Sequence, residues 1–177
     1  MKRSYQRICS ILFYTFLFTY LSLLLHALIF QRIHWPITAR SVNLIPFDTI
    51  GDYVLELVHG SDSDRLAFDN LLFNILFFVP LGLYLPLFGA DRNVMSCFKW
   101  ILLFCVAVEV LQWSFRLGVA DIDDVILNCL GGFLGLMMYK VLLTACKQKQ
   151  KVRLCTTILS VAAGLPALYF AYDHILL

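Results

Sequence analysis

Apolar residues fill five stretches of the chain, and the lengths of these stretches predict helices that cross a membrane. The stretches cover residues 8–30, 71–88, 100–115, 125–143 and 154–175. Because a helix rises about 1.5 Å per residue, about 20 apolar residues span the hydrocarbon core of a bilayer. The second stretch contains Pro80 and Pro86 and the third contains Glu109, and neighbouring helices can accommodate such interruptions. We therefore expect about five transmembrane helices.

A polar segment of residues 31–70 separates the first two stretches, and part of it has helical periodicity. Asp48 is a candidate N-cap residue, because its carboxylate can accept hydrogen bonds from free amides of a first helical turn. Apolar residues around it recur at helical spacing, namely Phe47, Ile50, Val54, Leu57 and Val58. This pattern predicts a short helix that lies in the membrane interface.

The composition agrees with a membrane location. The chain has 177 residues, of which 60% are hydrophobic and 15% are charged, whereas soluble domains carry about 25% charged residues. We predict an all-α fold in the cell membrane, a polytopic helical bundle that forms a single domain over residues 1–177. Its long outer loop holds the short interfacial helix.

Charged residues are divided unevenly between the two ends of the predicted helices. One end holds ten basic residues and a single acid, Asp91, and the other holds four basic residues and eleven acids. Because basic loops stay on the cytoplasmic side, we expect the N-terminus inside and both residues 31–70 and the C-terminus outside. The net charge is only +2, so the basic loops indicate contact with membrane lipids rather than nucleic acid.

Polar side chains continue from the predicted outer boundary into three of the apolar stretches. On the third predicted helix, Cys105, Glu109, Gln112 and Arg116 share one helical face, and the fourth predicted helix carries Asp124 and Asn128 one turn apart. On the second, Asn70 and Asn74 are also one turn apart. Ionisable groups inside a membrane are costly and are usually functional. The similar depths predict one shared recess open to the outer leaflet.

Asp121, Asp123 and Asp124 precede the fourth stretch, and two interpretations of them stay open. Carboxylates at a helix N-terminus cap free amides and meet the positive end of the helix dipole. Together with Glu109, the same acids are weak candidates for a hard cation such as Mg²⁺. We predict no metal site and no cofactor. Three glycines further along this stretch let a neighbouring helix approach closely, namely Gly131, Gly132 and Gly135.

Four motifs together resemble the VanZ-like family. They are NLIPF at residues 43–47, DNLLFNILFFVPLG at 69–82, EVLQ at 109–112 and ADIDDVILNCLGGFLG at 120–135. The core of the resemblance covers residues 40–143, and a transmembrane helix at about 154–175 follows it. The resemblance implies a cell-envelope protein of mainly Gram-positive bacteria. The protein that gives the family its name confers resistance to teicoplanin, a glycopeptide antibiotic.

The favoured hypothesis is a binding site for a lipid, a lipid-linked wall precursor or an acylated drug. Arg40 and Arg116 would bind an anionic part, since guanidinium suits phosphate and carboxylate. The side chains that would line or orient the ligand are Asn43, Asn70, Asn74, Glu109, Gln112, Asp121, Asp124 and Asn128. An intramembrane enzyme with Glu109 and Asp124 as acid and base, or a structural scaffold, are the alternatives. The sequence carries no G-x-S-x-G nucleophile motif, and it defines no oligomeric state.

Overall fold

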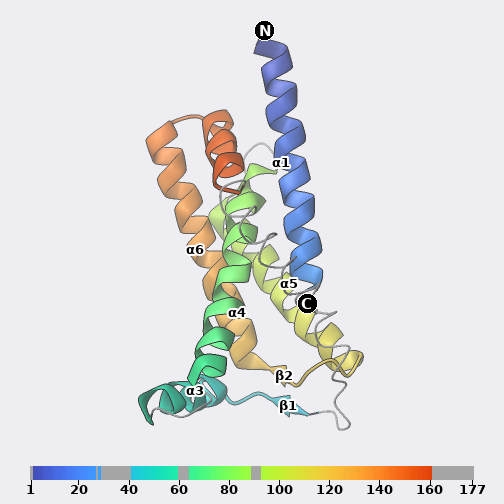
Figure 1. The fold of residues 1–177 in the computed structure, drawn as a ribbon, viewed down its shortest axis with the longest axis vertical. Coiled ribbons are helices and arrows are strands. Elements are labelled where there is room, and N and C mark those ends of the chain that lie inside the picture. The colour runs from blue at the N-terminus through green and yellow to red at the C-terminus, as the bar shows by residue number, and fades with distance from the viewer. Residues whose placement is uncertain (1, 27, 29–40, 60–63, 89–92, 161–177) are drawn as a thin grey trace.

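In the computed structural model of the protein, residues 2–26, 28, 41–59, 64–88 and 93–160 are described (Figure 1). Four of the helices in this part are long and apolar enough to cross a membrane, which confirms the predicted all-α bundle. They are α1 (Lys2–Leu25), α4 (Asp64–Tyr84), α5 (Val94–Ser114) and α6 (Ile122–Cys146). Residues 149–160 form the start of the predicted fifth helix, whose remainder lies outside the described residues.

The helix boundaries follow local capping chemistry more than the ends of the apolar runs. α5 begins at Val94 rather than Trp100, because the side chain of Asn93 accepts a hydrogen bond from the Met95 amide at 3.2 Å. α6 ends at Cys146, where Lys147 adopts a left-handed conformation with φ 58°. α4 keeps Pro80 inside its span and continues into the short 3-10 helix η2 (Leu85–Leu87).

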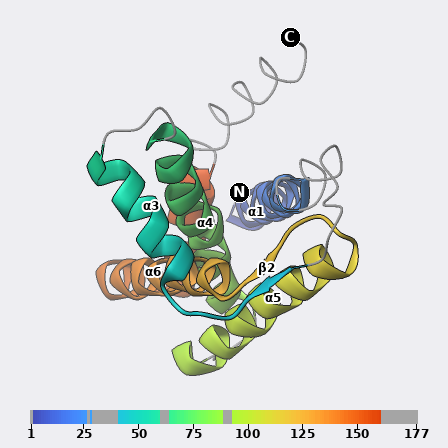
Figure 2. The same ribbon diagram turned by 90° about the horizontal axis from the view of Figure 1, so that it is seen from below.

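The helix predicted in the long polar segment is α3 (Asp48–His59). It lies across the ends of α4 and α6 rather than alongside them, as Figures 1 and 2 show. Its exposed apolar residues include Leu55 and Val58, which are 56% and 75% exposed. A helix in this position can rest its apolar side on lipid at the membrane boundary.

A two-residue parallel strand pair accompanies the helices, which the sequence pattern did not predict. β1 (Val42–Asn43) pairs with β2 (Ala120–Asp121), with Val42 opposite Ala120 and Asn43 opposite Asp121. The segment between α5 and α6 is thereby joined to the segment that precedes α3. Strands of two residues leave no periodic trace in a sequence, since alternation needs about four residues to be visible.

Glycines bring α4 and α6 into backbone contact. A Cβ atom added to Gly131 would overlap the carbonyl oxygen of Ile75, and one added to Gly135 would overlap that of Val79. From the opposite side, a Cβ on Gly82 of α4 would overlap the carbonyl oxygen of Gly132. Gly132 itself faces α5, where a Cβ would lie 2.5 Å from Ile101 Cγ2. Only glycine allows helices to approach this closely.

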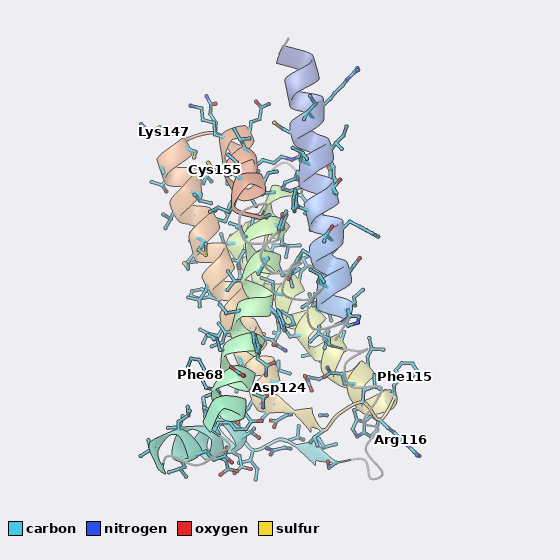
Figure 3. All side chains as sticks on the ribbon, in the orientation of Figure 1. Phe68, Phe115, Arg116, Asp124, Lys147 and Cys155 are labelled. Carbon is cyan, nitrogen blue, oxygen red and sulfur yellow. The ribbon has the colours of Figure 1, made fainter. Side chains whose placement is uncertain are left out.

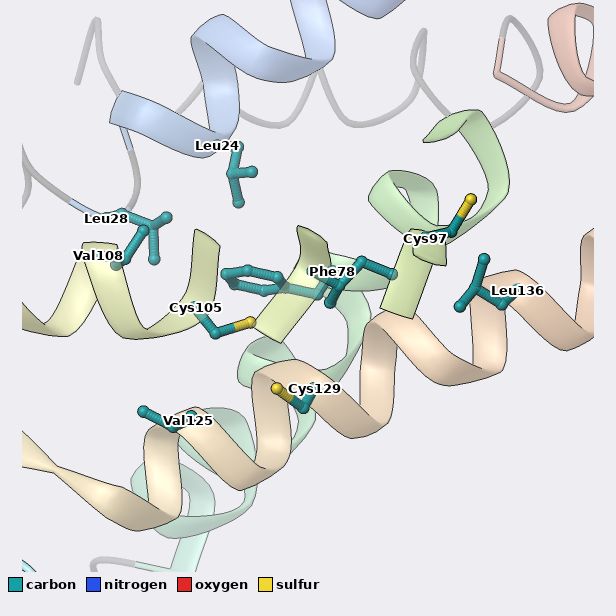
Figure 4. Packing of buried hydrophobic residues seen from close by; sticks show 10 residues of the cluster. Leu24, Leu28, Phe78, Cys97, Cys105, Val108, Val125, Cys129 and Leu136 are labelled. Atoms are coloured by element: carbon teal, nitrogen blue, oxygen red, sulfur yellow. The ribbon is translucent and has the colours of Figure 1, made fainter. Parts of the chain in front are cut away.

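The buried core lies between α1, α4, α5 and α6. Phe78, Ile101, Cys105 and Leu136 are all 0% exposed. Figure 4 shows Cys105 of α5 and Cys129 of α6 with their sulfur atoms directed toward each other. Close packing of small and large side chains is the main attraction between helices in lipid, where no water is displaced.

The two ends of the bundle differ in charge. We call the end that carries α3, β1 and β2 the acidic end, and the end that carries residues 140–153 the basic end (Figure 1). Within the described part of the chain, the acids all lie in residues 48–69 and 109–124. The uneven division of charged residues that the sequence suggested is therefore a separation of charge along the long axis of the bundle.

The glycine contacts predict that a single methyl group added at the helix crossing will lower the stability of the protein. Gly135→Ala should destabilise the protein by about 1–3 kcal/mol, the usual cost of overpacking, because the methyl group meets a main-chain oxygen that cannot turn aside. Thermal unfolding of the purified protein in detergent measures this. Gly51→Ala is the matched control, since a Cβ at Gly51 meets nothing within 4 Å. Equal melting temperatures for the two variants would contradict the close crossing.

Candidate functional site

The acidic end contains a polar cluster formed by α4, α5, α6, β2 and the start of α3. Its first link joins two spanning helices, because Asn74 Nδ2 of α4 donates a hydrogen bond of 2.6 Å to Asp124 Oδ1 of α6. Figure 3 shows Asp124 close to the junction of α4, α6 and β2. The bond lies at the level of the first turn of α6, just beyond the glycine crossing.

Asp123 is the most buried acid of the cluster, with 0% of its side chain exposed. Its Oδ1 accepts a hydrogen bond from the Phe47 amide at 2.6 Å, and its Oδ2 accepts one from the Ile50 amide at 3.0 Å. These amides belong to the start of α3, where a helix leaves its donors without partners. An acid from the start of α6 therefore caps α3.

This geometry corrects the sequence-based assignment of Asp48 as the N-cap. Asp48 is the first residue of α3, and Phe47 before it has a left-handed backbone with φ 66°. The left-handed turn directs the first amides toward Asp123. The predicted cap was local, whereas the observed one comes from residues far along the chain.

Asp121 connects three elements. Its Oδ1 accepts from the Asp123 amide at 2.9 Å and so caps α6, and its Oδ2 accepts from Thr49 Oγ1 at 2.5 Å. Its own amide donates to Glu109 Oε2 of α5 at 3.3 Å. Asn43 extends the chain of contacts, since its Nδ2 donates to Thr49 Oγ1 at 3.0 Å.

These contacts favour the capping interpretation of the acids over a cation site. Asp121, Asp123 and Asp124 each accept at least one hydrogen bond from a protein group. Among the described residues, no three His, Cys, Asp or Glu side chains are grouped in a way that could hold a metal ion. The acids act here as fixed acceptors that hold α3 and β1 against the bundle.

Three polar side chains lie deeper in the bundle. Glu109, Gln112 and Asn128 are 5%, 1% and 2% exposed. Gln112 Nε2 donates to the carbonyl oxygen of Leu28 at 2.8 Å, beyond the end of α1. The amide oxygens of Gln112 and Asn128 are buried without a hydrogen-bond partner in the described structure. Such acceptors are costly unless a donor reaches them, so they are candidate contacts for a ligand or for water.

Arg116 does not share a helical face with Glu109, contrary to the sequence-based expectation. α5 ends at Ser114, and Arg116 follows with φ 60°. Its side chain is exposed and points away from the bundle in Figure 3. The helical extrapolation failed because the chain reverses there to reach β2.

Asn70 and Arg40 were also predicted to line the site. Asn70 is exposed on α4 and its Nδ2 lies 3.4 Å from Tyr53 Oη of α3. Burial, followed by the negative charge of Asp124, raises the pKa of Tyr53, so its hydroxyl stays protonated at neutral pH. Arg40 lies outside the described residues.

An apolar groove of about 360 Å³ runs beside the cluster. One wall is a face of α5 with Val106, Val110 and Trp113, and Val42 of β1 and the following Leu44 line another side. Glu109 and Asp121 also line it, together with Ala120, Ile122 and Val125. Sequence reasoning missed this groove. The spacing of Val106, Val110 and Trp113 marks a helical face, but any lipid-facing helix shows the same signal.

Four spanning helices with a hydrogen-bonded polar cluster at one end define a multi-pass membrane protein. The VanZ/LLP1 family model matches residues 11–143, and the chain belongs to this family. It is 33% identical over 100 residues to Protein VanZ of Enterococcus faecium, across 56% of this chain and 53% of that protein. The chain thus spans about half the length of this curated relative. No solved structure matches the chain.

Because both oxygens of Asp123 cap α3, replacing one of them should weaken the start of that helix. Asp123→Asn keeps the shape of the side chain but replaces one acceptor oxygen with an NH₂ group that faces an amide donor. We expect the opening free energy of the Phe47 and Ile50 amides to fall by about 1–3 kcal/mol, as for other hydrogen bonds to charged groups. Hydrogen exchange of α3 measures this.

Asp52→Asn is the matched control for that measurement, because Asp52 is an exposed acid of the same helix. Unchanged exchange in Asp123→Asn would show that other contacts hold α3 in place.

Proposed function

We propose that this chain is a VanZ-like protein of the cell envelope that lowers sensitivity to teicoplanin and related lipoglycopeptides. In this proposal its acidic end binds an acyl chain, carried by a membrane lipid, a lipid-linked wall precursor or the drug itself. The membership of the VanZ/LLP1 family and the similarity to Protein VanZ support the biological setting. The chemistry of the binding step rests on the groove.

The groove is the observation that carries the proposal. Its volume of about 360 Å³ lies within the range of small-molecule sites, about 300–1,000 Å³. Eight of its ten lining residues are aliphatic or aromatic. The acyl tail of a drug that arrives from water would gain about 0.8 kcal/mol per buried methylene, whereas a chain that is already in lipid would gain close packing contacts only. The exposed face of a single helix has no second wall, whereas this groove has β1 along one side.

The polar groups beside the groove would orient the rest of the ligand. Arg116 is exposed just beyond the end of α5, and in this proposal its guanidinium binds the anionic headgroup of the ligand. Guanidinium binds phosphate and carboxylate through paired hydrogen bonds. Asn43 lies between the lining residues Val42 and Leu44, but its amide already donates to Thr49 and accepts from the Ile45 amide, so it would act by holding this segment in place. The predicted partner Arg40 belongs to the same segment of sequence.

We further propose that the acidic end faces the cell exterior. Lys140, Lys147, Lys149 and Lys151 at the basic end then lie in the cytoplasm, as the positive-inside rule requires. In this orientation the groove opens to the outer leaflet, which an externally added lipoglycopeptide meets first.

Filling the groove should weaken ligand binding without disturbing the core. Val110 lines the groove and is 54% exposed, so Val110→Phe should be tolerated by the fold and should occupy the ligand volume. A steric cost of about 1–3 kcal/mol corresponds to a loss of affinity of about 5- to 150-fold. We expect teicoplanin protection in an expressing strain, and retention of a fluorescent fatty-acyl lipid by the purified protein, to fall together.

Val141→Phe is the matched control, since Val141 is 68% exposed on α6 and does not line the groove. It should retain both protection and lipid. Full protection in Val110→Phe at normal protein levels would refute the groove as the binding site.

The acid–base alternative predicts a different result at Glu109. Glu109→Gln removes the proton-transferring group but leaves an oxygen able to accept the Asp121 amide. If the protein binds rather than catalyses, protection should stay within about twofold of the wild type, because general acid–base catalysis contributes about 10²–10⁴-fold. Loss of protection with an abundant, folded protein and retained lipid binding would favour an enzyme.

A further inference from the structure

The guanidinium of Arg153 at the basic end lies over two neighbouring aromatic rings and has no counter-charge among the described residues. Its Cζ atom is 4.2 Å from the centroid of the Phe13 ring and 4.9 Å from that of the Tyr14 ring, both on α1. Phe13 is 1% exposed, and Arg153 is partly buried. Arg153 thus connects residues 149–160 with α1 through cation–π contacts.

These contacts do not use the hydrogen-bonding capacity of the side chain. Nε and Nη2 of Arg153 are buried and have no hydrogen-bond partner in the described part of the chain. One turn further along the same face, Thr156 Oγ1 is also buried and unpartnered. Unsatisfied donors on a cation are unfavourable, and a buried charge normally has an opposite charge beside it.

No protein acid is placed to provide that charge among the described residues. All of their acids lie in residues 48–69 and 109–124, away from the basic end. Lys147, Lys149 and Lys151 precede Arg153 and increase the local positive potential. Figure 3 shows Lys147 and Cys155 both near this end of the bundle.

Arg153 lies near the start of the helical segment at the basic end, while its aromatic partners Phe13 and Tyr14 lie six and seven residues inside the apolar span of α1, Arg7–Leu25. Arg153 is four residues past the start of the helical segment at residue 149, or about 6 Å along the helix axis. A long basic side chain near the end of a membrane helix normally extends toward the phosphate layer of the bilayer. The phosphate of an anionic lipid is the anion most available there.

We propose that Arg153 is the centre of an anionic phospholipid site in the leaflet at the basic end. Its guanidinium binds the lipid phosphate, the rings of Phe13 and Tyr14 hold the guanidinium plane, and the three lysines attract the headgroup. This site is separate from the groove at the acidic end and does not depend on the proposed resistance function. It also does not depend on which end faces the cytoplasm.

The test measures lipid-dependent stabilisation of the full-length protein in detergent. Phosphatidylglycerol, phosphatidylcholine and inorganic phosphate are titrated separately, and thermal unfolding gives an apparent dissociation constant for each. We expect phosphatidylglycerol to raise the melting temperature of the wild type, and phosphatidylcholine and inorganic phosphate to have little effect. Arg153→Gln should weaken phosphatidylglycerol binding about tenfold.

Lys151→Gln is the matched control, because it removes one positive charge from an exposed position of the same segment. It should weaken binding much less than Arg153→Gln does. If Arg153→Gln fails to fold, Arg153→Lys keeps the charge but loses the planar fork, and it should still bind phosphatidylglycerol more weakly than Lys151→Gln.

Three results would overturn the proposal. Equal effects of the Arg153 and Lys151 variants would reduce it to general surface electrostatics. Equal stabilisation by inorganic phosphate and phosphatidylglycerol would make free phosphate the ligand instead of a lipid. Unchanged binding of phosphatidylglycerol is expected in Asp91→Asn, whereas clearly tighter binding in that variant would show that Asp91, rather than a lipid, is the partner of the basic end.

Discussion

The approach of α4 to α6 through glycine is the constraint on which the rest of the structure depends. Gly82, Gly131 and Gly135 leave room only for the opposing backbone, and in lipid such contact replaces the hydrophobic effect as the main attraction between helices. Because the two helix axes lie so close, the short side chain of Asn74 reaches Asp124 at 2.6 Å. With longer side chains at the crossing, the polar cluster at the acidic end would separate.

The acids at the start of α6 attach α3 and β1 to this helix pair. Asp123 caps α3, and Asp121 caps α6 while it contacts Thr49 and, through its amide, Glu109. Each acid thus does what carboxylates do at helix N-termini, but across elements rather than within one. The consequence for function is that β1 is held in place, and the groove beside the cluster has a second wall.

The charged groups at the two proposed sites find their partners in different places. At the acidic end the carboxylates receive donors from the protein itself, and the ligand we propose is mainly apolar. At the basic end the cation of Arg153 has aromatic rings but no acceptor in the described structure, so its partner is proposed to come from the membrane. In both proposals, the segregation of charge along the bundle axis sets the orientation of the protein and the chemistry available at each leaflet.

The sequence alone determined the class of protein, because a helix of about 20 apolar residues in lipid has few alternatives. The spans, the short helix after Asp48 and the family follow from length, periodicity and the four motifs. The tertiary structure decided the partners. It showed that Asp123 rather than Asp48 caps α3, that Arg116 lies beyond the end of α5, and that β1 pairs with β2. Such contacts join residues far apart in the chain, and local propensity carries no information about them.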